Sequence, residues 1–436
     1  MEKQKYSFTT AISMVVGIVI GSGIFFKADD ILVAVNGDVG LGLLGFLIVG
    51  VGVLFGALTV SYYALHDQEH IGLIGYSKMA LGKKFAFLVG WFSIVCYFPA
   101  LIVILAMLVA IYLSILLGIS SSLFITIATA VALIASFSIN IKSPNFGGKV
   151  QVVFTIAKII PLVVIGLVGA LFFNEPATTD VVAAPITGGA PLSALIAIAF
   201  AFDGWIVATN ISRELKNSKR DLPKALAFGS IGILAIYCLY FYGITRIIDP
   251  AQIVALGDGH TEFAANAILG AAGSKVITLF VVISVYGGLN GMTLAFLRLP
   301  KLLLDANLIK NIFGEDEKTQ EVRSILFCLV PIIFYFVFQQ LVDYGLIFSN
   351  LKHGFDISSL PIMINYLIYI VIFLSVNRLA AKESTKTRVY YLLISLVATI
   401  TAVVVIYGAM SVNGILYITF SIILSVVGIP FYNKEQ

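Results

Sequence analysis

Long apolar segments dominate this sequence and exclude a water-soluble fold. The chain has 436 residues, of which 60% are hydrophobic and only 11% charged, whereas soluble domains carry about 25% charged residues. Too little polar surface remains to cover a fold of this size in water. A helix needs about 20 apolar residues to cross the roughly 30 Å hydrocarbon core of a bilayer. We therefore expect an all-α integral membrane protein.

Twelve segments have the length and hydropathy of transmembrane helices. The first apolar run is not followed by a small-residue cleavage site, so we expect it to remain as a span. The predicted spans cover residues 8–34, 40–65, 84–117, 121–140, 149–173, 190–213, 224–247, 271–304, 323–341, 357–377, 387–410 and 413–432. We expect residues 1–436 to form a single membrane transport domain.

The charges between these segments predict how the chain lies in the membrane. With the N-terminus in the cytoplasm, 22 of the 27 lysines and arginines fall in cytoplasmic segments. Lys27, Arg246, Lys275 and Lys352 fall outside, and Lys158 lies deep in a span. Because cytoplasmic loops of membrane proteins carry an excess of Lys and Arg, we expect both termini in the cytoplasm and a multi-pass protein of the cell membrane.

Two of the predicted spans are interrupted by residues that weaken a helix. The first contains "GIVIGSGIFF", with Gly21, Ser22 and Gly23, and the sixth contains "AFAFDGW", with Asp203 and Gly204. A break inside lipid is tolerated only where protein or a water-filled cavity supplies hydrogen-bond partners. Two interruptions in corresponding halves point to a transporter binding site, whereas a single Gly-x-Gly is more typical of close helix packing.

The separation of the two breaks by five helices predicts an inverted repeat. One repeat spans about residues 8–173 and the second about 190–377, with the last two helices, about 387–432, appended. At each break, free N–H groups and free carbonyls form opposite electrostatic poles. The N–H groups after Gly23 suit a carboxylate, and the carbonyls before Gly21 and near 200–202 suit an ammonium. The pattern therefore predicts an amino acid site near the middle of the membrane.

Membrane enzymes and channels fit the sequence less well. No spaced cluster of His, Asp or Glu faces the membrane interior, which argues against a catalytic centre and implies no metal and no cofactor. The four histidines all lie in connections: His66, His70, His260 and His353. No ring of charges or repeated filter motif indicates a channel.

Three motifs resemble the amino acid–polyamine–organocation (APC) superfamily. They are "GIVIGSGIFF" in the first helix, "GYSKMALGKKFAFLVGW" leading into the third, and "AFAFDGWIVATNISRELKNSKRDLPKAL" in and after the sixth. The branch most similar to them is the L-type amino acid transporters (LAT), especially bacterial neutral amino acid exchangers of the alanine-serine-cysteine type. The resemblance covers the first ten spans and implies the APC fold, with 12 transmembrane helices, a 5+5 inverted repeat and interrupted helices 1 and 6.

The resemblance also implies a substrate site. It places the substrate carboxylate on backbone N–H groups of the first break, with the N–H of Ser22 more important than its hydroxyl. It places the ammonium on carbonyls of both breaks, and makes Phe200 the aromatic gate toward the outside. The implied binding residues are Val19, Ile20, Gly21, Ser22, Gly23, Phe200, Ala201, Phe202, Asp203 and Gly204.

Asp203 departs from the family pattern, because eukaryotic members often have a second glycine there. Two roles remain open for this carboxylate. It can cap the second half of the sixth helix by accepting from freed N–H groups, or it can take part in substrate or proton binding.

Lys158 lies ten residues into the fifth span, about 15 Å from its cytoplasmic end. A lysine at that depth must pair, lose its proton or line a cavity. Sodium-coupled relatives of the same fold hold sodium here, between helices one, five and eight. The resemblance therefore implies that Lys158 bridges Gly17 to the eighth helix, at Ser284, and that transport does not need sodium. Tyr240 is a further candidate near the site, with packing as its alternative role.

The expected function is sodium-independent exchange of small neutral L-amino acids by alternating access. A proton-coupled symporter of the same fold is the alternative, since a Lys158 that releases its proton would drive uptake. Mammalian members bond a heavy-chain subunit through a cysteine after the third helix, but "LLGISSSLF" lacks one. No covalent heavy-chain subunit is therefore expected. The long outer connection, residues 247–270, has helical patterning suited to a lid.

Overall fold

A computed structural model describes most of the chain in atomic detail. It covers residues 8–20, 23–66, 72–142, 144–177, 181–183, 185–209, 215, 217–349, 351 and 355–433, with backbone alone at 10, 18 and 144–157. These residues are almost entirely helical, and an isolated β-bridge joins Ile309 to Tyr432. The predicted all-α class is confirmed.

Nine helical segments of the described chain are long and apolar enough to cross a membrane. They are Val39–His66 (α4), Lys83–Leu117 (α6, η1 and α7), Ser122–Lys142 (α8), Ser218–Ile247 (α11), Pro250–Asp305 (α12, η4 and α13), Glu317–Asp343 (α14), Ser359–Lys382 (α15 and η5), Thr385–Met410 (α16) and Gly414–Phe431 (α17 and η6). A short helix, α5 (Leu73–Leu81), precedes α6.

Helices outside these nine segments lie where the other three spans are predicted. The first span is divided into α1 (Phe8–Val19), α2 (Gly23–Phe26) and α3 (Ala28–Ala34). The fifth corresponds to α9 (Pro144–Phe172), and the sixth to η2 (Pro191–Ser193) with α10 (Ala194–Ala201). The total of twelve spans and the inverted repeat stay predictions.

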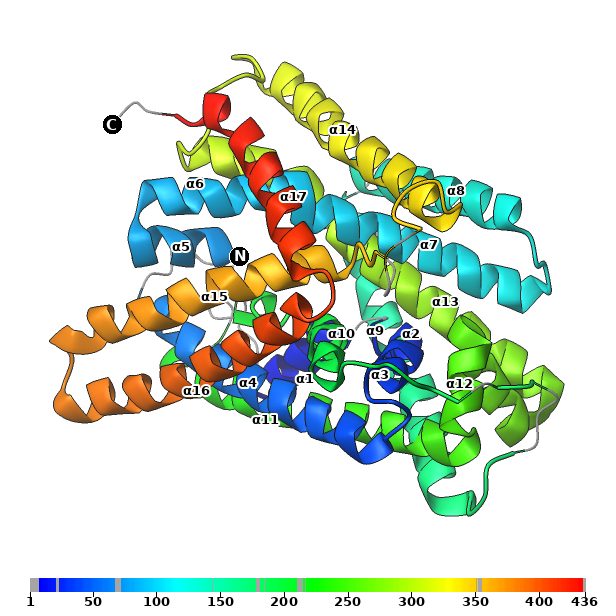
Figure 1. Cartoon of the computed structure of the whole chain (residues 1–436). Coiled ribbons are helices and arrows are strands. Elements are labelled where there is room, and N and C mark those ends of the chain that lie inside the picture. The colour runs from blue at the N-terminus through cyan, green and yellow to red at the C-terminus, as the bar shows by residue number, and fades with distance from the viewer. Residues whose placement is uncertain are drawn as a thin grey trace.

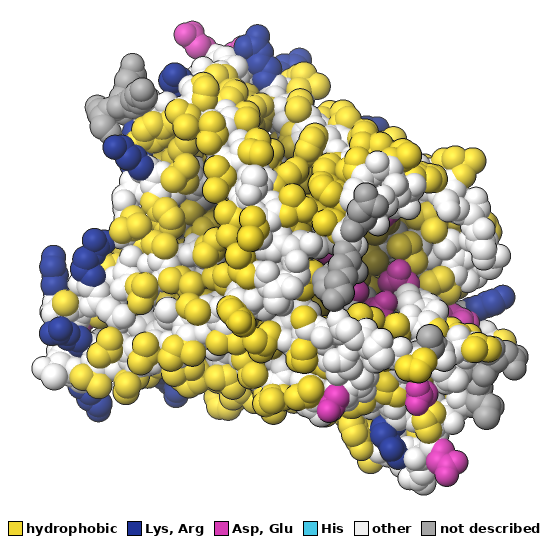
Figure 2. Space-filling model, in the orientation of Figure 1, with side chains coloured by type: hydrophobic (Ala, Val, Ile, Leu, Met, Phe, Trp, Pro, Cys, Tyr) yellow, Lys and Arg dark blue, Asp and Glu magenta, His cyan; other side chains and the backbone are white. Residues whose placement is uncertain are grey.

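Apolar side chains cover much of the surface, as a membrane protein requires. Ile134 on α8, Val330 on α14 and Ile415 on α17 are 66%, 67% and 73% exposed. Figure 2 shows hydrophobic side chains over most of the visible face, with most lysines and arginines at its left side and top and most carboxylates toward the right. Apolar surface of this extent cannot face water, so the chain is a multi-pass membrane protein.

The interrupted helices occupy the middle of the bundle (Figure 1). α1 packs on α11, and α10 packs on α4, α15 and α16. α9 packs against both α11 and α13, which brings its buried face toward the first break. Both breaks are therefore enclosed by protein, as backbone that leaves the helical pattern inside a membrane must be.

The outer connection forms helices of its own. α12 (Pro250–Leu256) and the 3₁₀ turn η4 (Gly257–Gly259) run into α13 (His260–Asp305). α13 thus begins before the predicted boundary at 271, and its kink lies at Gly270, with φ 69°. The expected helical pattern is confirmed, and α12 packs on α3, beside the outer half of the first span. A lid role stays a prediction.

Candidate substrate-binding site

The two helix breaks lie against each other. α1 ends at Val19 and α2 begins at Gly23, while α10 ends at Ala201. A Cβ atom on Gly23 would lie 2.9 Å from the Ala201 Cα and 2.9 Å from the Phe200 ring. Glycine is needed here because any side chain would separate the two backbones. Gly21 and Ser22 lie outside the described residues, so their predicted contacts with a carboxylate stay predictions.

The second break begins where the α-helical hydrogen bonds of α10 end. The N–H of Phe202 bonds the carbonyl of Ile198 at 3.2 Å, and residues 204–209 then continue with i→i+3 bonds. Gly204 has φ 92°, a conformation that favours glycine. A second half of the span running as regular helix from Gly204 was expected. Over residues 204–209 the structure corrects this to 3₁₀ turns, which are tighter than an α-helix.

Asp203 is held by a tyrosine that the sequence analysis missed. The Tyr97 hydroxyl donates to Asp203 Oδ2 at 2.5 Å. Tyr97 is the last residue of η1 (Ser93–Tyr97), a π-helical turn between α6 and α7, and such turns are frequent at functional sites. Pro99 lacks an N–H and cannot continue the usual bonding pattern. That proline is the one sequence signal for this irregularity.

The Tyr237 hydroxyl contacts carbonyls of both breaks. It lies 2.8 Å from the carbonyl oxygen of Ala201 and 3.4 Å from that of Val19. Its buried ring packs edge-on against Phe202, with 5.0 Å between ring centroids. Two of the carbonyls predicted to hold the ammonium are thus close together, under a single polar group.

The sequence analysis selected Tyr240 instead of Tyr237. The Tyr240 hydroxyl lies 3.0 Å from the Thr261 hydroxyl, and its ring packs on Phe25 at 5.8 Å. It therefore contacts α13 and the outer half of the first span. The two tyrosines are three residues apart and lie on the same face of α11. Sequence alone does not distinguish which of them reaches the breaks.

Aromatic rings lie beside the second break, on the side that is predicted to face outward. Phe200 is 8% exposed, and its ring meets that of Phe26 edge-on at a centroid distance of 5.3 Å. The Lys27 ammonium lies 5.1 Å from the Phe26 ring and 5.7 Å from the Phe200 ring. Cation–π attraction holds an ammonium at this range, so Lys27 joins the two rings.

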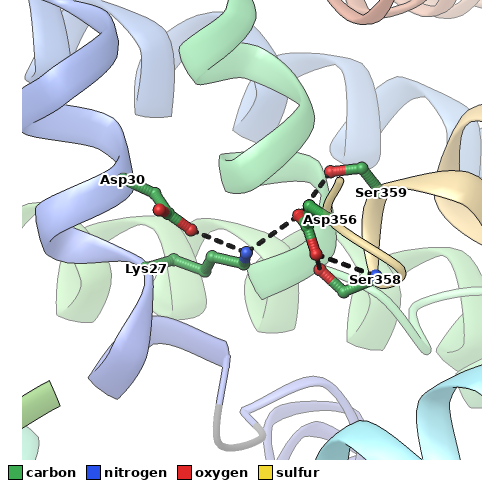
Figure 3. A network of polar contacts seen from close by, with 5 residues as sticks. All are labelled: Lys27, Asp30, Asp356, Ser358 and Ser359. Atoms are coloured by element: carbon green, nitrogen blue, oxygen red, sulfur yellow. Dashed lines mark hydrogen bonds and ion pairs between the residues drawn. The ribbon is translucent and has the colours of Figure 1, made fainter. Parts of the chain in front are cut away.

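Lys27 is also the centre of an ion-pair network (Figure 3). Its ammonium is 2.7 Å from Asp30 and 3.0 Å from Asp356. Asp356 accepts further hydrogen bonds from the N–H and hydroxyl of Ser358, at 2.8 and 2.6 Å, and from the Ser359 hydroxyl at 2.6 Å. We call these five residues the Lys27 network. The charge count assigns Lys27 to the outer side of the membrane, and that assignment stays a prediction; the structure adds that the side chain is buried, at 4% exposed.

The Asp356 carboxylate precedes α15 and stays ionised in this network. Burial raises its pKa, but the Lys27 ammonium and the hydrogen bonds from Ser358 and Ser359 outweigh burial and lower it to about 2. The pairing between Lys27 and Asp356 therefore persists at neutral pH.

Lys158 lies beside α1, on the side of the first break that is predicted to face the cytoplasm. It is 2% exposed, and its ammonium is 3.4 Å from the carbonyl oxygen of Gly17 in α1. The Ser284 hydroxyl on α13 is buried and has no hydrogen-bond partner among the described residues. The structure thus brings Lys158 to Gly17 but shows no bond to Ser284.

The family profile for amino acid permeases matches residues 6–431. The chain belongs to the amino acid permease family. The resemblance found in the three motifs is confirmed, and the permease is a transporter rather than an enzyme.

Several relatives resemble the permease over long alignments. The "Serine/threonine exchanger SteT" of Bacillus subtilis is 29% identical, and the alignment covers 99% of this chain and 96% of that protein. The mouse "b(0,+)-type amino acid transporter 1" is 26% identical, covering 66% and 60%. The mouse "Large neutral amino acids transporter small subunit 2" is 24% identical, covering 66% and 56%. The alignments thus include nearly all of the bacterial exchanger but little more than half of these mammalian proteins.

Proposed function

We propose that the permease exchanges small neutral L-amino acids across the cell membrane by alternating access, independently of sodium. The observation that carries this proposal is the convergence of the Val19 and Ala201 carbonyls on one hydroxyl, that of Tyr237. Two acceptors from different broken helices form a site for an ammonium group at the meeting point of the two breaks.

Binding replaces an internal contact with one to the substrate. Tyr237 has a single hydroxyl proton, so it satisfies one of the two carbonyls at a time. An ammonium brings three donors and can satisfy both. The backbone N–H groups of Gly21, Ser22 and Gly23 then receive the carboxylate. The substrate thereby supplies the hydrogen bonds that the broken backbone lacks.

The charges near the breaks favour neutral side chains. Asp203 is the one acidic side chain that either break carries, and its carboxylate already accepts from Tyr97. No lysine or arginine lies within the breaks, residues 19–23 and 200–204, to receive an acidic side chain. The aligned serine/threonine exchanger supports small substrates.

Lys158 supports transport without sodium. A fixed ammonium beside the Gly17 carbonyl occupies the inner side of the first break with a positive charge. Because a second cation would be repelled there, sodium has no role to fill. A Lys158 that stays charged keeps its proton through the whole cycle and moves none across the membrane. Protons then do not drive uptake, and each amino acid that enters is exchanged for one that leaves.

Alternating access follows from the division of the first span. Phe200, Phe26 and the outer half, α2 and α3, cover the site from outside. The inner half, α1, swings away to open the site toward the cytoplasm, where both termini lie. The loop "LLGISSSLF" has no cysteine, so the permease works without a covalently bonded heavy chain.

Transport by purified protein in liposomes tests this function. We expect uptake of labelled serine only when the liposomes contain an amino acid, with no change when potassium replaces sodium. Competition by all twenty amino acids should rank the small neutral ones first. Uptake into empty liposomes that follows an imposed pH gradient would instead establish proton symport. Ohmic currents without acceleration by internal amino acid would indicate a channel.

A further inference from the structure

We infer that Lys27 is a positioning residue of the outer gate and that it exchanges partners as the gate works. In the closed state it bridges Asp30 and Asp356, and on opening it leaves Asp356 but keeps Asp30. The inference that this contact gates the substrate site rests on the proposed transport function, but its first test does not require transport.

The two carboxylates belong to different moving parts. Asp30 is three residues after Lys27, in the first turn of α3, so it travels with Lys27. Asp356 is 329 residues away, immediately before α15. Only the second pair joins two elements that can separate. The Lys27–Asp356 contact therefore ties the outer half of the first span to α15.

Asp356 is held in place for this contact from its own side. Three hydrogen bonds from Ser358 and Ser359 fix its carboxylate at the start of α15. Its side chain is 37% exposed, so water can replace Lys27 when the gate opens. Lys27 differs, because its side chain is only 5% exposed. Leaving an ammonium that is buried to that degree without either carboxylate would be costly, and Asp30, which moves with Lys27, remains as its partner.

The ion pair and the aromatic gate are coupled through the same ammonium. Lys27 contacts the rings of both Phe26 and Phe200. Phe200 lies on α10, next to Ala201 at the second break. When Lys27 leaves Asp356 it also withdraws from the Phe200 ring. Opening of the ion pair thus uncovers the site that Phe200 closes.

An outer cavity borders this gate. It has a volume of about 180 Å³ and is lined by Lys27 together with four carboxylates, Asp29, Asp30, Asp258 and Asp356. These residues come from the outer half of the first span, the turn before α13 and the connection before α15. Lys27 is the one cation among the residues that line the cavity, so its position determines which of these carboxylates is neutralised.

The exchange of partners predicts opposite effects for two similar substitutions. Asp356→Asn weakens a contact that exists only in the closed state, so it favours opening. Asp30→Asn removes the one ion-pair partner that Lys27 keeps in the open state but only one of two such partners in the closed state, so it disfavours opening. A purely structural ion cluster would loosen in both variants.

Amide hydrogen exchange of the full chain in nanodiscs measures the gate without any substrate. For residues 23–34 and 355–360 we expect Asp356→Asn to speed exchange roughly tenfold, since losing one partner of a partly buried ion pair is destabilising. Asp30→Asn should leave exchange unchanged or slow it. Asp38→Asn is the matched control, because it removes an outer negative charge while the side chain can still accept from Leu41 N–H. Faster exchange in both Asp356→Asn and Asp30→Asn, or in neither, would overturn the inference.

Two further measurements guard against a variant that does not fold. Ser359→Ala keeps every charge and loses one bond to Asp356, so it should speed exchange in the same direction by about threefold, the effect of one hydrogen bond. In oriented liposomes, Asp356→Asn should lower the external KM and raise the internal KM, because the outward-facing state is more populated. Asp30→Asn should do the reverse. If the unaltered protein transports nothing, the proposed function fails while hydrogen exchange still decides the role of Lys27.

Discussion

Two buried lysines flank the first helix break, and their surroundings differ. On the inner side, Lys158 reaches one neutral acceptor, the Gly17 carbonyl, at 3.4 Å. On the outer side, Lys27 pairs with Asp30 and Asp356 at 2.7 and 3.0 Å and contacts two aromatic rings. The two halves of one divided span are therefore held by contacts of unequal strength.

The difference indicates which half moves more easily. A donor–acceptor distance of 3.4 Å exceeds the usual 2.7–3.2 Å and gives a weak bond. The bonds of Lys27 are shorter, at 2.7 and 3.0 Å, and join two ionised groups, so they are stronger than a long contact between an ammonium and a neutral carbonyl. The inner half, α1, is thus held loosely by Lys158, while α2 and α3 are held firmly by the Lys27 network. In the proposed transport cycle, this difference corresponds to a gate that is closed on the predicted outer side.

The largest expected effect comes from separating the two breaks themselves. Gly23→Val adds a side chain whose Cβ would lie 2.9 Å from the Ala201 Cα, and overpacking of this kind costs about 1–3 kcal/mol or more. We expect no measurable binding of labelled amino acid in a scintillation proximity assay. Gly232→Val is the matched control, because a Cβ on that glycine of α11 meets no atom within 4 Å. Ser22→Ala should be mild, since it keeps the backbone N–H. The reverse order of these effects would assign binding to the Ser22 hydroxyl.

Substitution of the two lysines should have different effects on the free energy of unfolding and on the rate of transport. Lys27→Met leaves Asp30 and Asp356 without their cation and should lower the free energy of unfolding by roughly 2–3 kcal/mol, less than for a fully buried pair. Lys158→Met loses one weak bond and should change stability by less than about 1 kcal/mol, yet reduce transport at least about tenfold. Thermal unfolding in detergent and exchange in liposomes measure the two quantities. The exposed Lys275→Met should change neither. Equal destabilisation by both lysine substitutions would contradict the comparison.

The contrast between these lysines also shows what the sequence can predict. The breaks were predictable because their signals are local, with glycine or aspartate inside an apolar run. Lys158 was found because it interrupts such a run. Lys27 was missed because it lies near a helix end, where a charge normally faces water, and because Asp356 is 329 residues away.

Tertiary contacts explain the other omissions. Tyr237 and Tyr240 have the same chemistry on one face of α11, and only packing places Tyr237 at the carbonyls. Tyr97 reaches Asp203 through a π-helical turn whose sequence signal, Pro99, is weak on its own. The fold class followed from hydropathy, which sums over many residues. Individual site residues depend on single contacts, and composition does not encode those.

The smallest predicted effect concerns pH and distinguishes two carboxylates of the outer cavity. The pKa of Asp356 is about 2, so this group stays ionised at any physiological pH. Burial, helped by the charge of Asp30 and opposed by Lys27, raises the pKa of Asp258 to about 6. In the closed state Asp258 keeps its proton up to about pH 6, whereas a carboxyl group exposed to water loses its proton at lower pH. Low pH therefore favours the closed state over the open state, and this preference is lost as pH rises through about 6. Opening exposes Asp258 to water, so higher pH should favour opening.

Hydrogen exchange of residues 23–34, corrected for intrinsic rates, measures this dependence between about pH 5 and pH 7. We expect roughly a threefold rise that disappears in Asp258→Asn, a modest effect because partial exposure to water weakens such charge interactions. Asp29 faces the same cavity, so Asp29→Asn serves as the parallel variant. A pH dependence that survives Asp258→Asn but not Asp29→Asn would identify Asp29, in the outer half of the first span, as the titrating group. Whichever carboxyl group titrates, the Lys27–Asp356 pair stays ionised between about pH 5 and pH 7. Titration therefore changes the ratio of closed to open protein without breaking the ion pair that closes the gate.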